Sequence, residues 1–159
     1  MKLQKKLAEA YYDIRKGIGF NKEPTVYGAF PADPYSHTPS GQGAKQPGMT
    51  GQVKEEVLTR WGELGVSINA GIGSFNPTIL RADEFGADGK LDFTWCGVPV
   101  TYTLVKAKSD TAICVKFADG KTAERDGTQL TEEESATLFN RNGGIKSIDV
   151  KVCLADTLL

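Results

Sequence analysis

The side chains best suited to bind a small ligand lie between residues 37 and 51. His37 is the only histidine in the chain, and Ser36 and Thr38 stand on either side of it. A neutral imidazole next to hydroxyl groups can bind a phosphate group or a sugar. The sequence therefore makes His37 a candidate ligand-binding residue. The alternative is a loop histidine whose ring is hydrogen-bonded to the backbone.

Gln46, Thr50 and Gly51 stand just before and at the start of a predicted helix. The free backbone N–H groups of a helix N-terminus, together with the helix dipole, attract anions. We therefore predict that Gln46, Thr50 and Gly51 join His37 in a site for phosphate or for a sugar. The simpler alternative is that Thr50 only caps the helix, by accepting a hydrogen bond from an N–H group of the first turn.

The residues typical of a catalytic centre are not found together. Ser36 is too close in sequence to His37 for the usual triad, and the chain has no Gly-x-Ser-x-Gly elbow. Glycoside hydrolysis needs two carboxylates held apart across a sugar. A glycine-rich turn holds such a geometry poorly, so we expect a solvated loop around the acidic residues Asp83, Glu84 and Asp88. The sequence thus predicts no catalytic residue.

The three cysteines are Cys96, Cys114 and Cys153, and no two of them have the spacing of a metal-binding pair. An odd number of cysteines in a chain of this length does not make a disulfide framework. We therefore expect buried free thiols in a reducing compartment, the cytoplasm. The sequence predicts neither a metal site nor a cofactor.

The charge balance bears on two classes of partner. Lys and Arg together number 19 and Asp and Glu number 20, which gives no electrostatic attraction for nucleic acid or an anionic membrane surface. The chain also has no apolar run of about 18 residues that could span a bilayer. We therefore predict that neither nucleic acid nor a membrane is a partner.

The candidate residues lead into a helix predicted over residues 51–65. Val53, Val57, Trp61 and Leu64 recur at steps of four, four and three, which places them on one apolar face. Gly65 can adopt the left-handed conformation that ends a helix. We expect this face, and in particular Val57 and Trp61, to be buried against a sheet.

Before this helix the sequence predicts another helix over residues 1–20 and an ordered loop over residues 21–50. The first helix has an apolar stripe but begins with lysines and no capping residue, which disfavours its first turn. The loop combines prolines with aromatic residues, and we expect the aromatic rings to pin it to a surface. We expect an exposed apolar patch here, covered by self-association or by a partner. The residues concerned are Leu3, Leu7, Tyr11 and Ile14 in the helix, and Tyr27, Phe30 and Tyr35 in the loop.

From residue 66 onward strands dominate. Asp88-Gly89 and Asp119-Gly120 are typical of turns, and residues 91–105 read as one long strand with a bulge or an edge position in its middle. Thr131 and Glu134 form a capping box that predicts a short helix near residues 131–141. The sequence thus predicts a mainly β (α+β) fold, an antiparallel β-sandwich-like domain with two or three packed helices. We expect a single domain over residues 1–159, in which residues 66–159 form the β-rich sandwich.

Four short motifs follow one another in a recognisable order. They are Met49-Thr50-Gly51, Gly65-Val66, Ile72-x-x-Phe75-x-Pro77-x-x-Leu80, and the long strand over residues 91–105 with Tyr102 near its end. This order resembles the C-terminal region of glycoside phosphorylases of the cellobiose phosphorylase type and of related six-hairpin (α/α)6 carbohydrate-active proteins. In those proteins the first motif opens the last barrel helix, which runs into a closing β-sandwich. Residues 34–39 resemble an active-site loop of the same group more loosely.

The resemblance implies a detached C-terminal structural domain of a carbohydrate-active protein, related to glycoside phosphorylases and hydrolases. The barrel and the Asp-rich motif that carries the general acid have no counterpart in the sequence, so we expect no catalysis by the chain alone. The expected partners are a barrel-domain protein or a second copy of the chain. The alternative is a free-standing module that binds phosphate or a carbohydrate through His37, Gln46 and Thr50.

Overall fold

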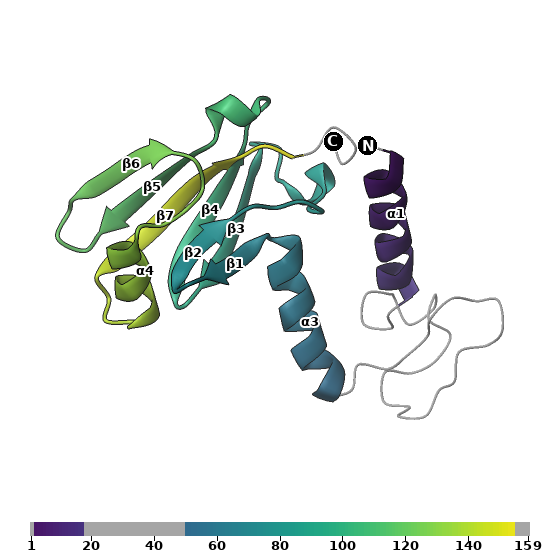
Figure 1. Ribbon diagram of the computed structural model, residues 1–159, viewed down its shortest axis with the longest axis horizontal. Coiled ribbons are helices and arrows are strands. Elements are labelled where there is room, and N and C mark those ends of the chain that lie inside the picture. The colour runs from purple at the N-terminus through teal and green to yellow at the C-terminus, as the bar shows by residue number, and fades with distance from the viewer. Residues whose placement is uncertain (1, 18–49, 155–159) are drawn as a thin grey trace. The chain divides into compact units, whose positions relative to one another are not determined.

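The computed structural model describes residues 2–17 and 50–154 (Figure 1). The chain divides into two compact units, residues 1–59 and residues 60–159. The division falls between Thr59 and Arg60, inside helix α3 (Thr50–Glu63), so this helix contributes residues to both units. The expected single domain over residues 1–159 stays a prediction.

The first unit contains helix α1 (Lys2–Gly17) and the beginning of α3. Arg15 of α1 forms an ion pair with Glu56 of α3. Two members of the predicted apolar stripe of α1, Leu7 and Ile14, are exposed. The period of the stripe therefore predicted the helix correctly, but these two side chains are not part of a core. The loop predicted over residues 21–50 lies outside the described residues.

The second unit is built on a five-stranded sheet with the strand order β3-β4-β7-β5-β6. β4 and β7 run parallel, and the other three pairs are antiparallel. The last strand along the chain, β7, is therefore the central strand of this sheet. The strands are β3 (Lys90–Trp95), β4 (Val98–Leu104), β5 (Ala112–Phe117), β6 (Thr122–Asp126) and β7 (Ile145–Val152).

A hairpin and a short helix complete the second unit (Figure 1). Strands β1 (Val66–Asn69) and β2 (Ile72–Phe75) form a separate two-stranded antiparallel sheet, and helix α4 (Glu132–Phe139) connects β6 to β7. Two 3-10 turns, η2 (Ala82–Glu84) and η3 (Lys108–Asp110), lie in the connections before β3 and before β5. The predicted mainly β, α+β fold is thus confirmed: the described residues form seven strands in two mostly antiparallel sheets, with three α-helices.

The core lies on one face of the five-stranded sheet, because side chains alternate between the two faces along each strand. Phe75 of β2 makes edge-to-face ring contacts with Trp95 and Tyr102, at centroid distances of 5.3 and 6.1 Å. Trp95 also contacts Phe139 of α4 at 5.6 Å. The hairpin and α4 therefore cover this face, and Trp95 is a core residue.

The hairpin is held close to the sheet by its backbone. A Cβ atom on Gly73 would lie 2.8 Å from the Trp95 ring, so only glycine fits at this position. The Gly73 N–H donates to the Ser135 hydroxyl of α4 at 3.1 Å, and the Gly73 carbonyl accepts from the Leu130 N–H at 2.9 Å. The two sheets are thus joined through the start of α4.

The prediction of one long strand over residues 91–105 is wrong in one respect. It is two strands, β3 and β4, that pair with each other around a two-residue turn at Cys96 and Gly97. Both turn residues have positive φ, 53° and 83°, which matches the twist that a tight hairpin needs. The bulge or edge position that we expected in the middle of this strand is therefore a reversal of the chain at Cys96 and Gly97.

The prediction that Val57 and Trp61 are buried is also wrong. Their side chains are 47% and 44% exposed. Among the described side chains of α3, only Glu63, its last residue, is fully buried, and Leu64 follows it into the core. The apolar face was predicted correctly as a helical face, but among its described members only Leu64 belongs to the core.

Candidate functional site

The predicted ligand-binding residues are not brought together by any described contact. His37 and Gln46 lie outside the described residues. Thr50 and Gly51 form the first turn of α3, as the motif indicated, but the side chain of Thr50 is not described. A phosphate or sugar site at these four residues stays a prediction.

The cysteines are free, as expected, but half-buried rather than buried. Cys96 occupies the tight turn between β3 and β4, and Cys114 lies on the face of the sheet opposite the core. Burial raises the pKa of the Cys114 thiol, and the nearby carboxylates of Asp149 and Glu124 raise it further. Cys114 is therefore protonated at neutral pH and is a poor nucleophile.

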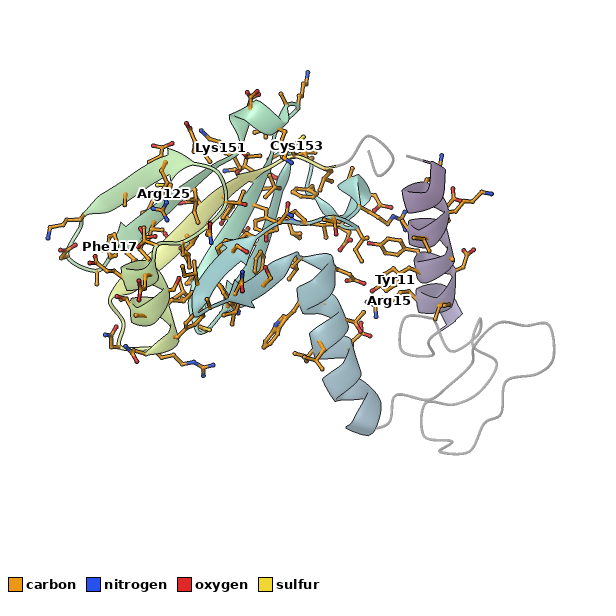
Figure 2. All side chains as sticks on the ribbon, in the orientation of Figure 1. Tyr11, Arg15, Phe117, Arg125, Lys151 and Cys153 are labelled. Atoms are coloured by element: carbon orange, nitrogen blue, oxygen red, sulfur yellow. The ribbon has the colours of Figure 1, made fainter. Side chains whose placement is uncertain are left out.

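The face of the sheet opposite the core is polar and internally paired. Lys116 forms an ion pair with Asp149 at 2.8 Å, and the Thr101 hydroxyl donates to Asp92 at 2.5 Å. Lys151, labelled in Figure 2, lies 3.8 Å from a carboxylate oxygen of Glu124. Acids and bases alternate here, so this face offers no field of one sign to a charged ligand. Within residues 2–17 and 50–154, no three His, Cys, Asp or Glu side chains form a potential metal site.

The most distinctive exposed feature is the apolar side of α3. We call Val57, Leu58 and Trp61 the α3 face, because positions i, i+1 and i+4 of a helix share one side. Leu58 is 64% exposed, and the other two are nearly half exposed. An aliphatic surface with an exposed tryptophan is typical of a protein contact, since tryptophan is enriched among the residues that dominate binding energy. The α3 face is therefore a candidate interaction site.

The end of α3 is anchored by a buried hydrogen bond. The hydroxyl of Tyr102, in β4, donates to the backbone carbonyl of Leu64 at 2.6 Å. Tyr102 has no exposed surface, and this burial raises the pKa of its hydroxyl far above the ordinary value. The hydroxyl is therefore protonated at every physiological pH and remains a donor to one of the carbonyls that a helix end leaves without an internal partner.

An ion-pair cluster forms a second anchor. Arg60 of α3 binds Glu63 at 2.8 Å and Glu84 of η2 at 2.6 Å. Burial lowers the pKa of Arg60, but the hydrogen bonds to both carboxylates outweigh it, so the net pKa is raised. Arg60 thus stays charged and ties the last turn of α3 to the segment before β3.

The acidic residues near η2 are only partly the solvated loop that we expected. Asp83 is exposed, with an ion pair to Arg81, and exposed Asp88 accepts from the Lys90 N–H at 3.2 Å. Glu84 is half-buried, because it faces Arg60. The expectation is therefore wrong for Glu84, which is a structural ion-pair partner.

A third polar cluster joins β6 to α4. Arg125, labelled in Figure 2, donates through both terminal nitrogens to Glu134, the first of them at 2.9 Å. Arg125 also donates to the Gln129 carbonyl at 2.9 Å. The carboxylate of Glu134 accepts from the Thr131 N–H at 2.8 Å, so the predicted capping box is confirmed and extended by an arginine. Nothing in the local sequence singled out Arg125, because its partner is nine residues away on another element.

Comparisons with known proteins do not identify a family. A scan against protein-family models and a search of curated proteins each find no match. Among the described helices, none is both long and apolar enough to cross a membrane.

Proposed function

We propose that this chain is a C-terminal structural domain of a carbohydrate-active protein of the six-hairpin (α/α)6 type, and that it does not catalyse the reaction by itself. The observation that carries this proposal is that α3 is fixed at its C-terminal end but has an exposed apolar face. Its last turn is anchored in the sheet unit, whereas the α3 face is about half exposed to solvent. A helix that packs among the helices of a barrel and ends in a sheet domain would have both properties.

The division of the chain supports the same proposal. The boundary between the two units falls within α3, so this helix contributes residues both to the unit that contains α1 and to the β-rich unit. In the group of proteins that the sequence resembles, the last barrel helix enters the closing β-sandwich in the same order. Two of the described ion pairs, Arg60–Glu84 and Arg125–Glu134, join separate elements, which suits a supporting role.

The test is co-expression of the chain with the barrel-bearing polypeptide encoded in the same genome. We expect a stable complex by size exclusion with light scattering, with the α3 face in the contact. Trp61→Glu should weaken the complex at least about tenfold, because it places a charge in an apolar contact, a change worth about 1.4 kcal/mol or more. Ile68→Glu is the matched control: Ile68 is 57% exposed on β1, outside the α3 face, and its substitution should leave binding unchanged.

Three outcomes would contradict the proposal. They are a complex that Trp61→Glu leaves intact, a genome that encodes no such barrel, or turnover of a disaccharide by the chain alone, with or without phosphate. A phosphate titration of the isolated chain separates the alternative binding module. Amide NMR shifts centred on residues 50–53, reduced in Thr50→Val and His37→Ala, would favour that alternative.

A further inference from the structure

We infer that Tyr102 is a positioning residue, which together with Arg60 locks the last turn of α3 and the β1–β2 hairpin onto the five-stranded sheet. The lock consists of two polar anchors, one on the backbone carbonyl of Leu64 and the other on the side chain of Arg60. All the contacts that carry the inference lie within residues 60–159.

The first anchor acts on the backbone of the helix end. Leu64 donates its N–H to the Arg60 carbonyl at 2.9 Å and accepts the Tyr102 hydroxyl on its own carbonyl at 2.6 Å. Tyr102 is itself held by ring contacts to Phe75 and Phe93, at 6.1 and 4.9 Å. The hydroxyl therefore extends from the core and donates to the backbone carbonyl of Leu64, the residue that follows the end of α3.

The junction that follows leaves little room for movement. Gly65 has a φ of 67°, and a Cβ atom there would lie 2.1 Å from the backbone of Asn76. The Gly65 carbonyl accepts from the Asn76 N–H at 2.8 Å, so the residue after α3 is paired with the residue after β2. The end of α3 and the β1–β2 hairpin are thus joined by a backbone hydrogen bond, next to the Leu64 carbonyl that Tyr102 binds.

The second anchor acts on side chains. Glu63 is almost fully buried at the carboxyl end of a helix, where the dipole disfavours an acid. Arg60 neutralises it and reaches Glu84 on a separate segment. Because Trp61 belongs to the same turn, its presentation to a partner depends on both anchors; this last step rests on the proposed function.

Hydrogen exchange measured on the whole chain tests the lock without any partner. In Tyr102→Phe the amides of Leu64, Gly65 and Asn76 should exchange about tenfold faster, the effect of losing one buried hydrogen bond. The amides of β7 should change much less, because the core ring remains. Arg60→Gln should accelerate the Leu64 and Gly65 amides in the same selective way.

Thr101→Val is the matched control. Thr101 is the neighbour of Tyr102 on β4 and loses a hydroxyl hydrogen bond of similar length, but to Asp92 on the opposite face. It should leave the Leu64, Gly65 and Asn76 amides unchanged. Equal acceleration of these amides and those of β7 in Tyr102→Phe, or no acceleration, would overturn the inference. If the chain does not bind the barrel-bearing polypeptide, but Tyr102→Phe still accelerates exchange at the Leu64, Gly65 and Asn76 amides selectively, the result would count against the proposed function alone.

Discussion

The Glu134 carboxylate joins helix α4 to strand β6 and to the cap residue Thr131, which gives Glu134 the clearest pH dependence among the described residues. Burial alone would raise its pKa, but hydrogen bonds from Arg125 and the Thr131 N–H outweigh burial and hold the pKa below the ordinary value of 4.5. A carboxyl with a lowered folded pKa stabilises the fold above its unfolded pKa. That contribution is lost as the pH falls below 4.5 and through the folded value.

We predict that Glu134→Gln lowers the free energy of unfolding at pH 7 by about 2 kcal/mol, because it weakens charge-assisted hydrogen bonds to a half-buried arginine. The deficit should shrink as the pH falls below 4.5, since wild-type Glu134 is then protonated too. Urea melts at several pH values measure this. Glu133→Gln, on the exposed side of the same helix turn, is the control and should keep the wild-type acid dependence. A deficit that is constant from pH 7 to 3 would contradict the assigned role.

Gly65 and Gly71 separate two costs of replacing a glycine. Both have positive φ, 67° and 79°, but a Cβ on Gly65 would meet the Asn76 backbone, whereas nothing lies within 4 Å at Gly71. We predict that Gly71→Ala costs about 1–2 kcal/mol, the backbone strain alone. Gly65→Ala should cost more than about 4 kcal/mol or prevent folding, because backbone atoms must move. Thermal unfolding of the two variants measures both losses of stability. Similar losses would mean that the backbone around Gly65 and Asn76 shifts to accommodate the added Cβ atom.

At the residue scale the sequence predicted local chemistry well. Gly65 as a helix end and Thr131 with Glu134 as a capping box could both be predicted from the sequence, because each feature depends on residues within four positions. The pairing of Arg60 with Glu84 and that of Arg125 with Glu134 could not be predicted, since Glu84 is 24 positions from Arg60 and Glu134 belongs to another element than Arg125. The predicted site at His37, Gln46, Thr50 and Gly51 stays a prediction.

At the scale of elements the sequence predicted helices better than their surroundings. The period of Val57, Trp61 and Leu64 identified α3, but a helical period does not say which part of a face meets the protein's own core. For the strands, Cys96-Gly97 was missed as a turn because an asparagine or aspartate normally precedes the glycine of such a turn. The parallel pairing of β7 with β4 joins residues nearly fifty positions apart and has no local signal.

The exposure of Trp61 leads to a stability prediction opposite to the one that its expected burial would have given. Trp61→Ala should lower the free energy of unfolding by less than about 1 kcal/mol, because an exposed side chain leaves no cavity. Leu64→Ala, three positions along the same face, should cost about 2–5 kcal/mol, because Leu64 is 4% exposed within the core cluster. Urea melts of the two variants make the comparison. A Trp61 variant as unstable as the Leu64 variant would mean that the α3 face is covered within the chain.

At the scale of the whole molecule, the hydrophobic core formed by the described residues belongs to the unit of residues 60–159. The hydrophobic cluster runs from Leu64 to Leu154, and its members come from the hairpin, the five-stranded sheet, α4 and their connections. In the described part of residues 1–59 the only fully buried hydrophobic residue is Ala8. The described residues of the two units therefore differ: those of residues 60–159 form a core, whereas α1 and the start of α3 present apolar side chains such as Leu7, Ile14 and Leu58 to solvent.

We predict that a fragment of residues 60–159 folds by itself. It keeps the entire core cluster, both anchors of the lock and all seven strands, so its unfolding in urea should be cooperative, with a midpoint close to that of the full chain. A fragment of residues 1–59 should show little helix by circular dichroism, because short helices without a packed face are marginal in water. If residues 60–159 instead give a non-cooperative transition, the helices before residue 60 stabilise the sheet unit, and the chain folds as the single domain that the sequence predicted.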